Sequence, residues 1–276
     1  MHNNLDKIIT VELSTPLDDR GLDALDSTIS RLLDAGIKSI SIPDNPLGKA
    51  HLDSVSLSTY IKQQYGLSPL THINARDRNK LALEASLLSL STFGLNKVLL
   101  INGDPIAETY SFNEKLTTLD FIRFVKSLGT EDNFSREFKI TAALDTSKTN
   151  FESELAYARE KIAAGTDAFM TQIITSEQNL QNLAKARACL PQDIKIIAGI
   201  YPLLNLEHAL HLNANAPGID IPAETIRRFA DIDPVELAIE QVNKALTHAD
   251  GVYIVIPKNG LELILEVIKR ISDSKS

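Results

Sequence analysis

The sequence predicts a single-domain (β/α)8 barrel of the TIM type. Eight runs rich in Ile, Val and Leu recur along the 276 residues, and stretches with helical periodicity fill the gaps between them. The runs show little polar alternation, as expected of parallel strands that are buried on both faces. Because no linker rich in Pro, Gly or Ser interrupts the eight units, one closed barrel is favoured. A doubly wound open sheet is the alternative, since strand count alone does not establish closure.

The predicted elements follow one another in a regular order. The strands are Ile8–Leu13, Ser39–Ile42, Pro69–Ile73, Val98–Ile101, Ile140–Leu144, Ala168–Gln172, Ile194–Ile200 and Val252–Ile256. Apolar stripes predict two of the helices, one with Leu22, Leu25, Ile29, Leu32 and Leu33, the other with Leu81, Ala85, Leu88 and Phe93. Glycines at the left-handed C-cap position mark helix ends at Gly36, Gly66, Gly94 and Gly165. The longer insert between the last two strands predicts an extra helix.

Composition excludes several classes of protein. The net charge of −8 argues against nucleic acid as a partner, because phosphate binding requires a basic surface. No apolar run approaches the length needed to cross a membrane, and no signal peptide is visible, so we expect a cytoplasmic protein. The lone cysteine, Cys189, is expected to be a packed and inert thiol. Dinucleotide, P-loop, serine-hydrolase and metal-binding motifs are not found, and we expect no metal.

Polar side chains collect at the carboxyl ends of the predicted strands. In chain order these residues are Glu12, Asp44, His72, Asn102, Asp104 (directly after Gly103), Asp145, Gln172, Tyr201 and Lys258. The carboxyl ends of barrel strands meet at one rim, and this rim carries the active site in such folds. The sequence therefore predicts a binding site there, with His72 and Asp104 on neighbouring strands.

Each of these residues also has a structural explanation when it is taken alone. A lone histidine such as His72 is more often a hydrogen-bonded structural group than a catalyst. Residues 76–79 resemble a charged helix N-terminus, with Asp77 as the cap and Arg76 in an ion pair. Gly103-Asp104-Pro105 is a turn signature. The functional interpretation depends on how many such residues share one rim.

Several motifs in a fixed order resemble the methylenetetrahydrofolate reductase family. The similarity is greatest to the reductase portion of bifunctional homocysteine methyltransferase/methylenetetrahydrofolate reductases, and it runs over nearly the whole chain. The motifs are Val11-Glu12 with Pro16, Asp44-Asn45-Pro46-Leu47-Gly48, His72-Ile73 with Arg76-Asp77-Arg78-Asn79, Gly103-Asp104-Pro105, Ala163-Ala164-Gly165, Met170-Thr171-Gln172, Ala198-Gly199-Ile200 with Pro202-Leu203, and Pro217-Gly218-Ile219 with Ile221-Pro222.

The resemblance implies a flavin-dependent reaction of one-carbon metabolism, linked to methionine biosynthesis. FAD would accept a hydride from NAD(P)H and pass it to 5,10-methylenetetrahydrofolate, which would become 5-methyltetrahydrofolate. Glu12 matches the general acid that helps to open the five-membered folate ring to an iminium. Asp104 matches the aspartate near the flavin pyrimidine and the pterin.

The resemblance also implies which residues hold the ligands. The positions that match cofactor contacts are His72, Asn102, Gly103, Asp104, Glu154 and Lys161. Gln172 matches the amide that reads the pterin edge, and Tyr201 at the seventh strand end is expected to contact the substrate. We expect either a homo-oligomer or an electron-donor or methyltransferase partner.

Departures from the family pattern leave other functions open. Leu144 replaces an aromatic residue that packs on the cofactor, and Asn102 stands where Arg or Thr often precedes Gly-Asp. One alternative is therefore a divergent, non-catalytic or repurposed paralog that binds folate or a protein partner without flavin. Another is a flavin-free barrel enzyme, such as a pterin-dependent methyltransferase or an aldolase with Lys258 as its lysine.

Overall fold

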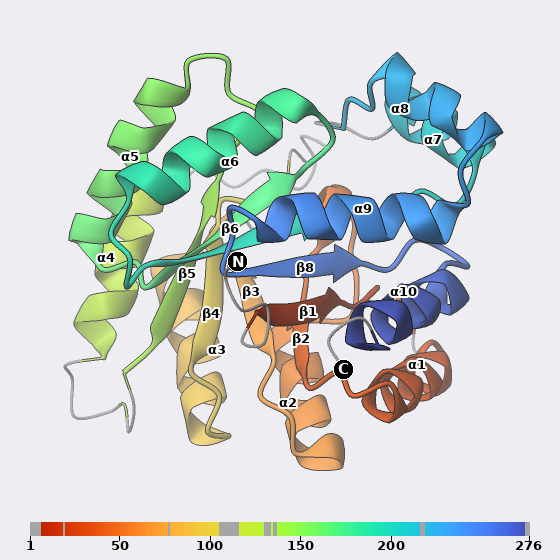
Figure 1. Ribbon diagram of the computed structural model, residues 1–276. Helices are drawn as coiled ribbons and strands as arrows, with labels where there is room; N and C mark the ends of the chain where they lie inside the picture. The colour runs from red at the N-terminus through yellow and green to blue at the C-terminus, as the bar shows by residue number, and fades with distance from the viewer. Residues whose placement is uncertain are drawn as a thin grey trace.

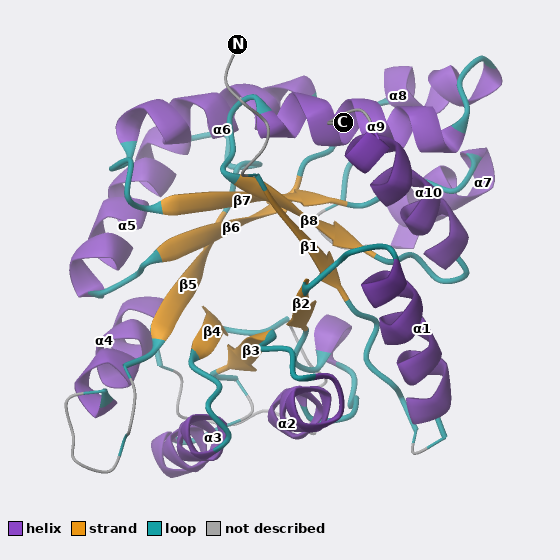
Figure 2. Ribbon diagram, turned by 60° about the horizontal axis from the view of Figure 1, so that its bottom comes forward, coloured by secondary structure: helices purple, strands orange, loops and turns teal. Residues whose placement is uncertain are grey.

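Eight parallel strands form the centre of the computed structural model, which describes residues 7–273 apart from 19, 77, 105–115, 130–133, 135–136 and 216–218. The strands are β1 (Ile8–Glu12), β2 (Ser39–Ile42), β3 (Leu70–Asn74), β4 (Lys97–Ile101), β5 (Lys139–Leu144), β6 (Ala168–Ile173), β7 (Lys195–Ile200) and β8 (Gly251–Val255). They pair in chain order, and β1 also pairs with β8, which closes the ring (Figure 2). The predicted barrel is confirmed, and every predicted strand agrees with the observed one to within one residue at each end.

The helices surround this ring (Figures 1 and 2). They are α1 (Leu22–Asp34), α2 (Ser54–Tyr65), α3 (Lys80–Thr92), α4 (Thr118–Leu128), α5 (Phe151–Ala164), α6 (Glu177–Cys189), α7 (Leu206–Asn215), α8 (Ala223–Arg227), α9 (Pro234–Leu246) and α10 (Leu261–Asp273), with 3-10 turns η2 (Pro46–Gly48) and η4 (Arg228–Ala230). The extra helix predicted between the last two strands is present as α7 and α8, which extend beyond the ring in Figure 1. Pro217 and Gly218 of that insert lie outside the described residues.

Apolar side chains fill both sides of the strands. A large core lies between the strands and the helices, and it includes Ile29 and Leu32 of the predicted α1 stripe. A smaller cluster is formed by one side chain from each of four strands, namely Leu99, Met170, Ile197 and Tyr253. This double burial explains why the strand sequences are almost continuously apolar.

The predicted apolar stripe of α3 is wrong. Leu81, Leu88 and Phe93 are 75%, 43% and 41% exposed, whereas Leu83 and Leu87 are fully buried. Both faces of this helix carry leucines at helical spacing, so periodicity alone cannot tell which face meets the barrel. The four predicted helix-end glycines, by contrast, all have positive φ, as expected.

Cys189 is exposed rather than packed. It is the last residue of α6, and the buried face of that helix is formed by residues that include Leu183 and Ala186. The apolar neighbours of Cys189 in the sequence therefore did not indicate the side of the helix on which it lies.

Two adjacent leucines of α3 test the observed helix face. We expect Leu87→Ala to lower the free energy of unfolding by about 2–5 kcal/mol, because it leaves a cavity in the core. We expect Leu88→Ala to change it by less than about 0.5 kcal/mol, because this side chain faces outward. Denaturant unfolding of both variants measures the difference, and a larger loss for Leu88→Ala would contradict the assignment.

Candidate active site

A cavity of about 590 Å³, here called the mouth cavity, opens at the carboxyl ends of the strands. The predicted residues that line it are Glu12, His72, Asn102, Gly103, Asp104, Glu154, Lys161 and Gln172. The structure therefore brings together every predicted site residue except Tyr201. Since β1 and β5 lie on opposite sides of an eight-stranded ring, Glu12 and the loop after β5 belong to opposite walls.

Glu12 and His72 form a pair of titratable groups on one wall. Oε2 of Glu12 lies 3.8 Å from Nε2 of His72, and both side chains are largely buried. Burial raises the pKa of Glu12 to about 7 and lowers the pKa of His72 to about 3. Among the described residues, Nε2 of His72 has no hydrogen-bond partner. Near neutral pH the wall therefore holds a neutral imidazole and a carboxyl group that can give up a proton.

Asp104 is held at the rim by two neighbouring loops. Its Oδ2 accepts a hydrogen bond from the backbone N–H of Leu47 at 2.7 Å, and its carbonyl oxygen accepts one from Arg76 at 2.5 Å. Leu47 has a φ of 56°, which is uncommon for a residue other than glycine. Gly103 has a φ of 80°, and an added Cβ there would lie 3.1 Å from the Arg76 guanidinium. Pro105 of the predicted turn lies outside the described residues.

Asp44 is a buried carboxylate that is paired beside the cavity. Oδ2 of Asp44 lies 2.5 Å from Nη1 of Arg78, and the same guanidinium contacts Asp53 at 3.0 Å. The backbone N–H of Asn74 also donates to Asp44 at 2.9 Å. Burial raises the pKa of Asp44, and the charge of Arg78 opposes this shift. This cluster joins the loops after β2 and β3, so Asp44 serves a structural purpose at the rim.

The N-terminus of α3 differs from the prediction for residues 76–79. Its cap is Asn79, which accepts a hydrogen bond from the backbone N–H of Ala82. The predicted cap is therefore wrong, because the helix begins after Asn79, and Asp77 itself lies outside the described residues. Arg78 makes ion pairs here, with Asp44 and Asp53.

Lys161 and Glu154 meet on the opposite wall, where both are buried. The Lys161 ammonium donates to the Ala143 carbonyl oxygen at 2.7 Å and lies 3.5 Å from Oε1 of Glu154. It also lies 4.3 Å from the centroid of the Tyr157 ring. Burial lowers the pKa of Lys161, and Glu154 opposes the shift. The structure therefore shows an ammonium group that is fixed at the cavity wall.

Tyr201 is separated from the other predicted residues. It lines a different, smaller cavity together with Leu203, Leu212 and Ile221. Its ring centroid lies 5.8 Å from that of His208. The predicted contact between Tyr201 and a substrate therefore stays a prediction, whereas Gln172 of the neighbouring strand lines the mouth cavity.

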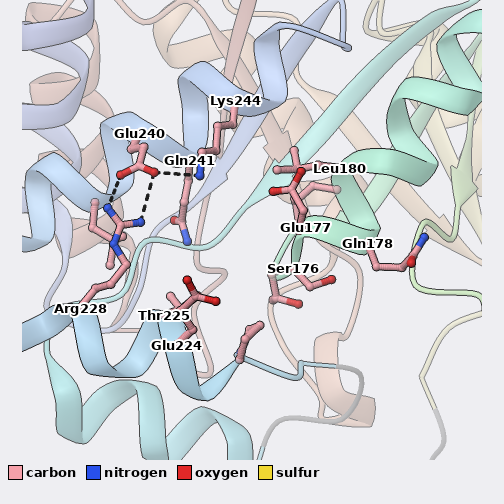
Figure 3. A pocket seen from close by; sticks show the side chains of 14 residues that line it. Ser176, Glu177, Gln178, Leu180, Glu224, Thr225, Arg228, Glu240, Gln241 and Lys244 are labelled. Atoms are coloured by element: carbon pink, nitrogen blue, oxygen red, sulfur yellow. Dashed lines mark hydrogen bonds and ion pairs between the residues drawn. The ribbon is translucent and has the colours of Figure 1, made fainter.

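Another cavity, of about 360 Å³, lies between α6, α8 and α9 (Figure 3). Arg228 and Lys244 both bind Glu240 in its wall, so these charges compensate one another. None of the predicted site residues lines it. The mouth cavity is therefore the candidate active site.

Sequence analysis missed Lys148 and Tyr253, which also line the mouth cavity. Lys148 follows the fifth strand, and its ammonium lies 3.7 Å from Asp145. Tyr253 lies in the middle of β8 rather than at its end, so a survey of strand ends did not include it. The sequence signal that could have indicated Tyr253 is Gly199, its partner in the β7–β8 register. A glycine inside a strand often marks the close approach of another group.

Comparison with known proteins identifies the family. The family model described as methylenetetrahydrofolate reductase matches residues 1–252. The chain belongs to this family. The predicted resemblance is therefore confirmed, and membership supports an oxidoreductase-like enzyme with a folate-related function.

Two solved structures with low sequence identity to this chain share its fold. An uncharacterized protein from Clostridium thermocellum, which binds two copies of 5-methyl-5,6,7,8-tetrahydrofolic acid, has a TM-score of 0.72 at 15% identity, with 98% of this chain and 96% of that chain covered. EDTA monooxygenase from Chelativorans sp. BNC1 has a TM-score of 0.62 at 9% identity, with 98% and 94% covered.

The described residues of this family member offer a donor set that fits a flavin in the mouth cavity. Nε2 of His72 is a buried polar atom without a hydrogen-bond partner in the described part of the chain, and the Asn102 and Gln172 side chains line the same space. Lys148 and Lys161 bring ammonium groups to the wall around β5, where they lie 3.7 Å from Asp145 and 3.5 Å from Glu154. Within the described ranges, no group of three His, Cys, Asp or Glu side chains is placed to hold a metal ion. No helix in the described part of the chain is both long and apolar enough to span a bilayer.

The raised pKa of Glu12 predicts a pH-dependent effect of Glu12→Gln on stability. An unfolded carboxyl group releases its proton near pH 4.5, whereas the folded one keeps it until about pH 7, so the wild type loses stability across this interval. We expect Glu12→Gln to be more stable than the wild type by up to about 3 kcal/mol at pH 8, and by much less at pH 5. Unfolding in denaturant at both pH values measures this, and an equal difference at the two would contradict the shift.

Proposed function

We propose that the protein reduces 5,10-methylenetetrahydrofolate to 5-methyltetrahydrofolate, with NAD(P)H as the electron source and FAD as the hydride carrier. Membership of the methylenetetrahydrofolate reductase family supports this reaction class. The mouth cavity, at about 590 Å³, is within the range of sites that hold a cofactor or a small substrate. A cytoplasmic location remains part of this proposal.

The buried carboxyl group of Glu12 is the observation that carries the proposal. Opening the five-membered ring of the substrate requires a proton on the folate nitrogen whose bond to the methylene carbon breaks. A general acid works best when its pKa lies near the operating pH, and burial raises the pKa of Glu12 to about 7. Glu12 would donate this proton, and an iminium with positive charge would form on the folate.

The remaining cavity residues support the same chemistry. Asp104 brings a carboxylate to the rim, whereas Asp44 and Asp145 in the cavity wall are paired with Arg78 and Lys148. A carboxylate at the rim, such as that of Asp104, favours the cationic iminium over its neutral precursor. Gln172 would bind the pterin edge through its side-chain amide, which can donate and accept hydrogen bonds at once.

Residues from β3, from the loop after β4 and from α5 would hold the cofactor, and Asp104 at the rim is one of them. Bound FAD would supply hydride transfer, which no amino-acid side chain provides. His72, Asn102 and Gly103 would contact its ring system, since they line the cavity on the β3–β4 side. Lys161 would act as a fixed positive charge toward the pyrophosphate, with Glu154 holding its ammonium in place.

A second candidate function is folate binding without flavin. The Lys161 ammonium already contacts Glu154 and the Ala143 carbonyl oxygen, which reduces its capacity to bind a pyrophosphate. Leu144, at the end of β5, replaces an expected aromatic residue. A protein of the same fold from Clostridium thermocellum binds two copies of 5-methyl-5,6,7,8-tetrahydrofolic acid. An aldolase is less well supported, because the exposed Lys258 does not line the mouth cavity.

The visible spectrum of the purified protein separates the two candidates. We expect flavin absorbance, either as purified or after reconstitution with FAD, because the cavity offers a ring site and two lysines. A colourless protein that cannot be reconstituted but still binds 5-methyltetrahydrofolate in calorimetry would support the second candidate and reject the first. A homo-oligomer or a donor protein remains a prediction that the same preparation can test by size-exclusion chromatography.

The role of Glu12 as an acid predicts both a mutant phenotype and a pH profile. We expect Glu12→Gln to lower turnover by about 10²–10⁴-fold, because the amide cannot donate the proton. Wild-type turnover should fall as the pH rises through about 7, since the protonated carboxyl is the active form. Steady-state assays of methylenetetrahydrofolate reduction measure both effects.

The matched control for this experiment is Glu137→Gln, the same chemical change at an exposed residue that pairs with Lys126. It should leave turnover unchanged. Retention of full activity in Glu12→Gln would remove the general-acid assignment.

A further inference from the structure

Strand β6 contains a bulge at the edge of the mouth cavity. Met170 pairs with Ile197 and Ile173 pairs with Gly199, so Thr171 and Gln172 together lie opposite a single residue of β7. Bulges interrupt the ladder of backbone hydrogen bonds and are frequent beside active sites. The backbone around Gln172 therefore needs hydrogen-bond partners from outside the regular ladder.

The hydroxyl groups of Tyr253 and Thr171 supply these hydrogen-bond partners. The Tyr253 hydroxyl donates a hydrogen bond of 2.8 Å to the carbonyl oxygen of Thr171. The Thr171 hydroxyl accepts the N–H of Gly199 at 3.0 Å and donates to the carbonyl oxygen of Gln172 at 2.6 Å. The neighbouring strands β6, β7 and β8 (Figure 2) are thus joined at the residue that precedes Gln172.

Gly199 provides the space that Tyr253 needs to reach β6. The two residues are partners in the β7–β8 register, and an added Cβ on Gly199 would lie only 2.6 Å from the Tyr253 hydroxyl oxygen. A side chain at this position would therefore displace the ring. Burial, together with the charge of Glu12, holds the pKa of Tyr253 well above its usual range, so the hydroxyl keeps its proton and remains a donor.

We propose that Tyr253 is a positioning residue, whose hydroxyl holds the β6 bulge in the conformation that presents Gln172 to the folate ring. This inference rests on the proposed function, in which Gln172 binds the pterin edge. Tyr253 contributes through Thr171, because its one hydroxyl proton is used by the Thr171 carbonyl. Gly199 is required because it leaves room for the Tyr253 ring.

The test is a double-mutant cycle on folate affinity. Calorimetry measures the Kd of 5-methyltetrahydrofolate for the wild type, Tyr253→Phe, Gln172→Ala and the double variant. Tyr253→Phe removes the hydrogen bond to the Thr171 carbonyl oxygen and so loosens the bulge, and we expect about a tenfold weaker Kd in the wild-type background. In the Gln172→Ala background the same change should cost less than about twofold, because the group being positioned is absent.

Two further variants keep the test specific. Tyr65→Phe deletes a hydroxyl that makes a 2.8 Å hydrogen bond to Asp26, and it should leave the Kd unchanged. Thr171→Val removes the other side-chain hydrogen bonds of the bulge, and it should weaken binding in the same non-additive way.

An equal loss for Tyr253→Phe in both backgrounds, or no loss in either, would overturn the positioning role while leaving folate binding intact. Failure of the wild type to bind the folate would instead overturn the proposed function, and this inference with it.

Discussion

Closure of the sheet is the constraint on which the rest of the structure depends. β1 pairs with β2 on one side and with β8 on the other, so the first and last strands of the described barrel lie side by side. Because all eight strands are parallel, the carboxyl ends of all of them then lie on one rim. Glu12 and Tyr253 are distant in the sequence, yet they line the same cavity because β1 pairs with β8. An open sheet would not bring these two residues together.

Burial within this ring accounts for the electrostatics of the site. Glu12 and His72 have their pKa values moved in opposite directions by one cause, the loss of solvent around each group. Near pH 7 the His72 imidazole is therefore neutral and the Glu12 carboxyl group is partly protonated, although a carboxyl and an imidazole would form an ion pair in water. The wall around β5 keeps charged groups instead, because Lys161 and Glu154 neutralise each other there.

The sequence predicted the parts of the structure that depend on local pattern. Buried parallel strands are continuously apolar and end at polar residues, so their bounds and most of the mouth cavity followed from the order of residues. Local pattern does not show which of two apolar helix faces packs against the barrel. For this reason the prediction placed Leu81 and Leu88 on the wrong side of α3. Local pattern also does not show contacts that cross strands, such as that of Tyr253 with Thr171.

Asp104 shows how a residue at such a rim can carry two tasks at once. Its carboxylate accepts the Leu47 amide and so maintains a left-handed turn after β2, independently of any ligand. Replacement by alanine would release this turn and remove the charge together, whereas asparagine would keep an oxygen acceptor and remove only the charge. The effect of losing the turn can therefore be distinguished from the effect of losing the charge only when the alanine and asparagine variants of Asp104 are compared.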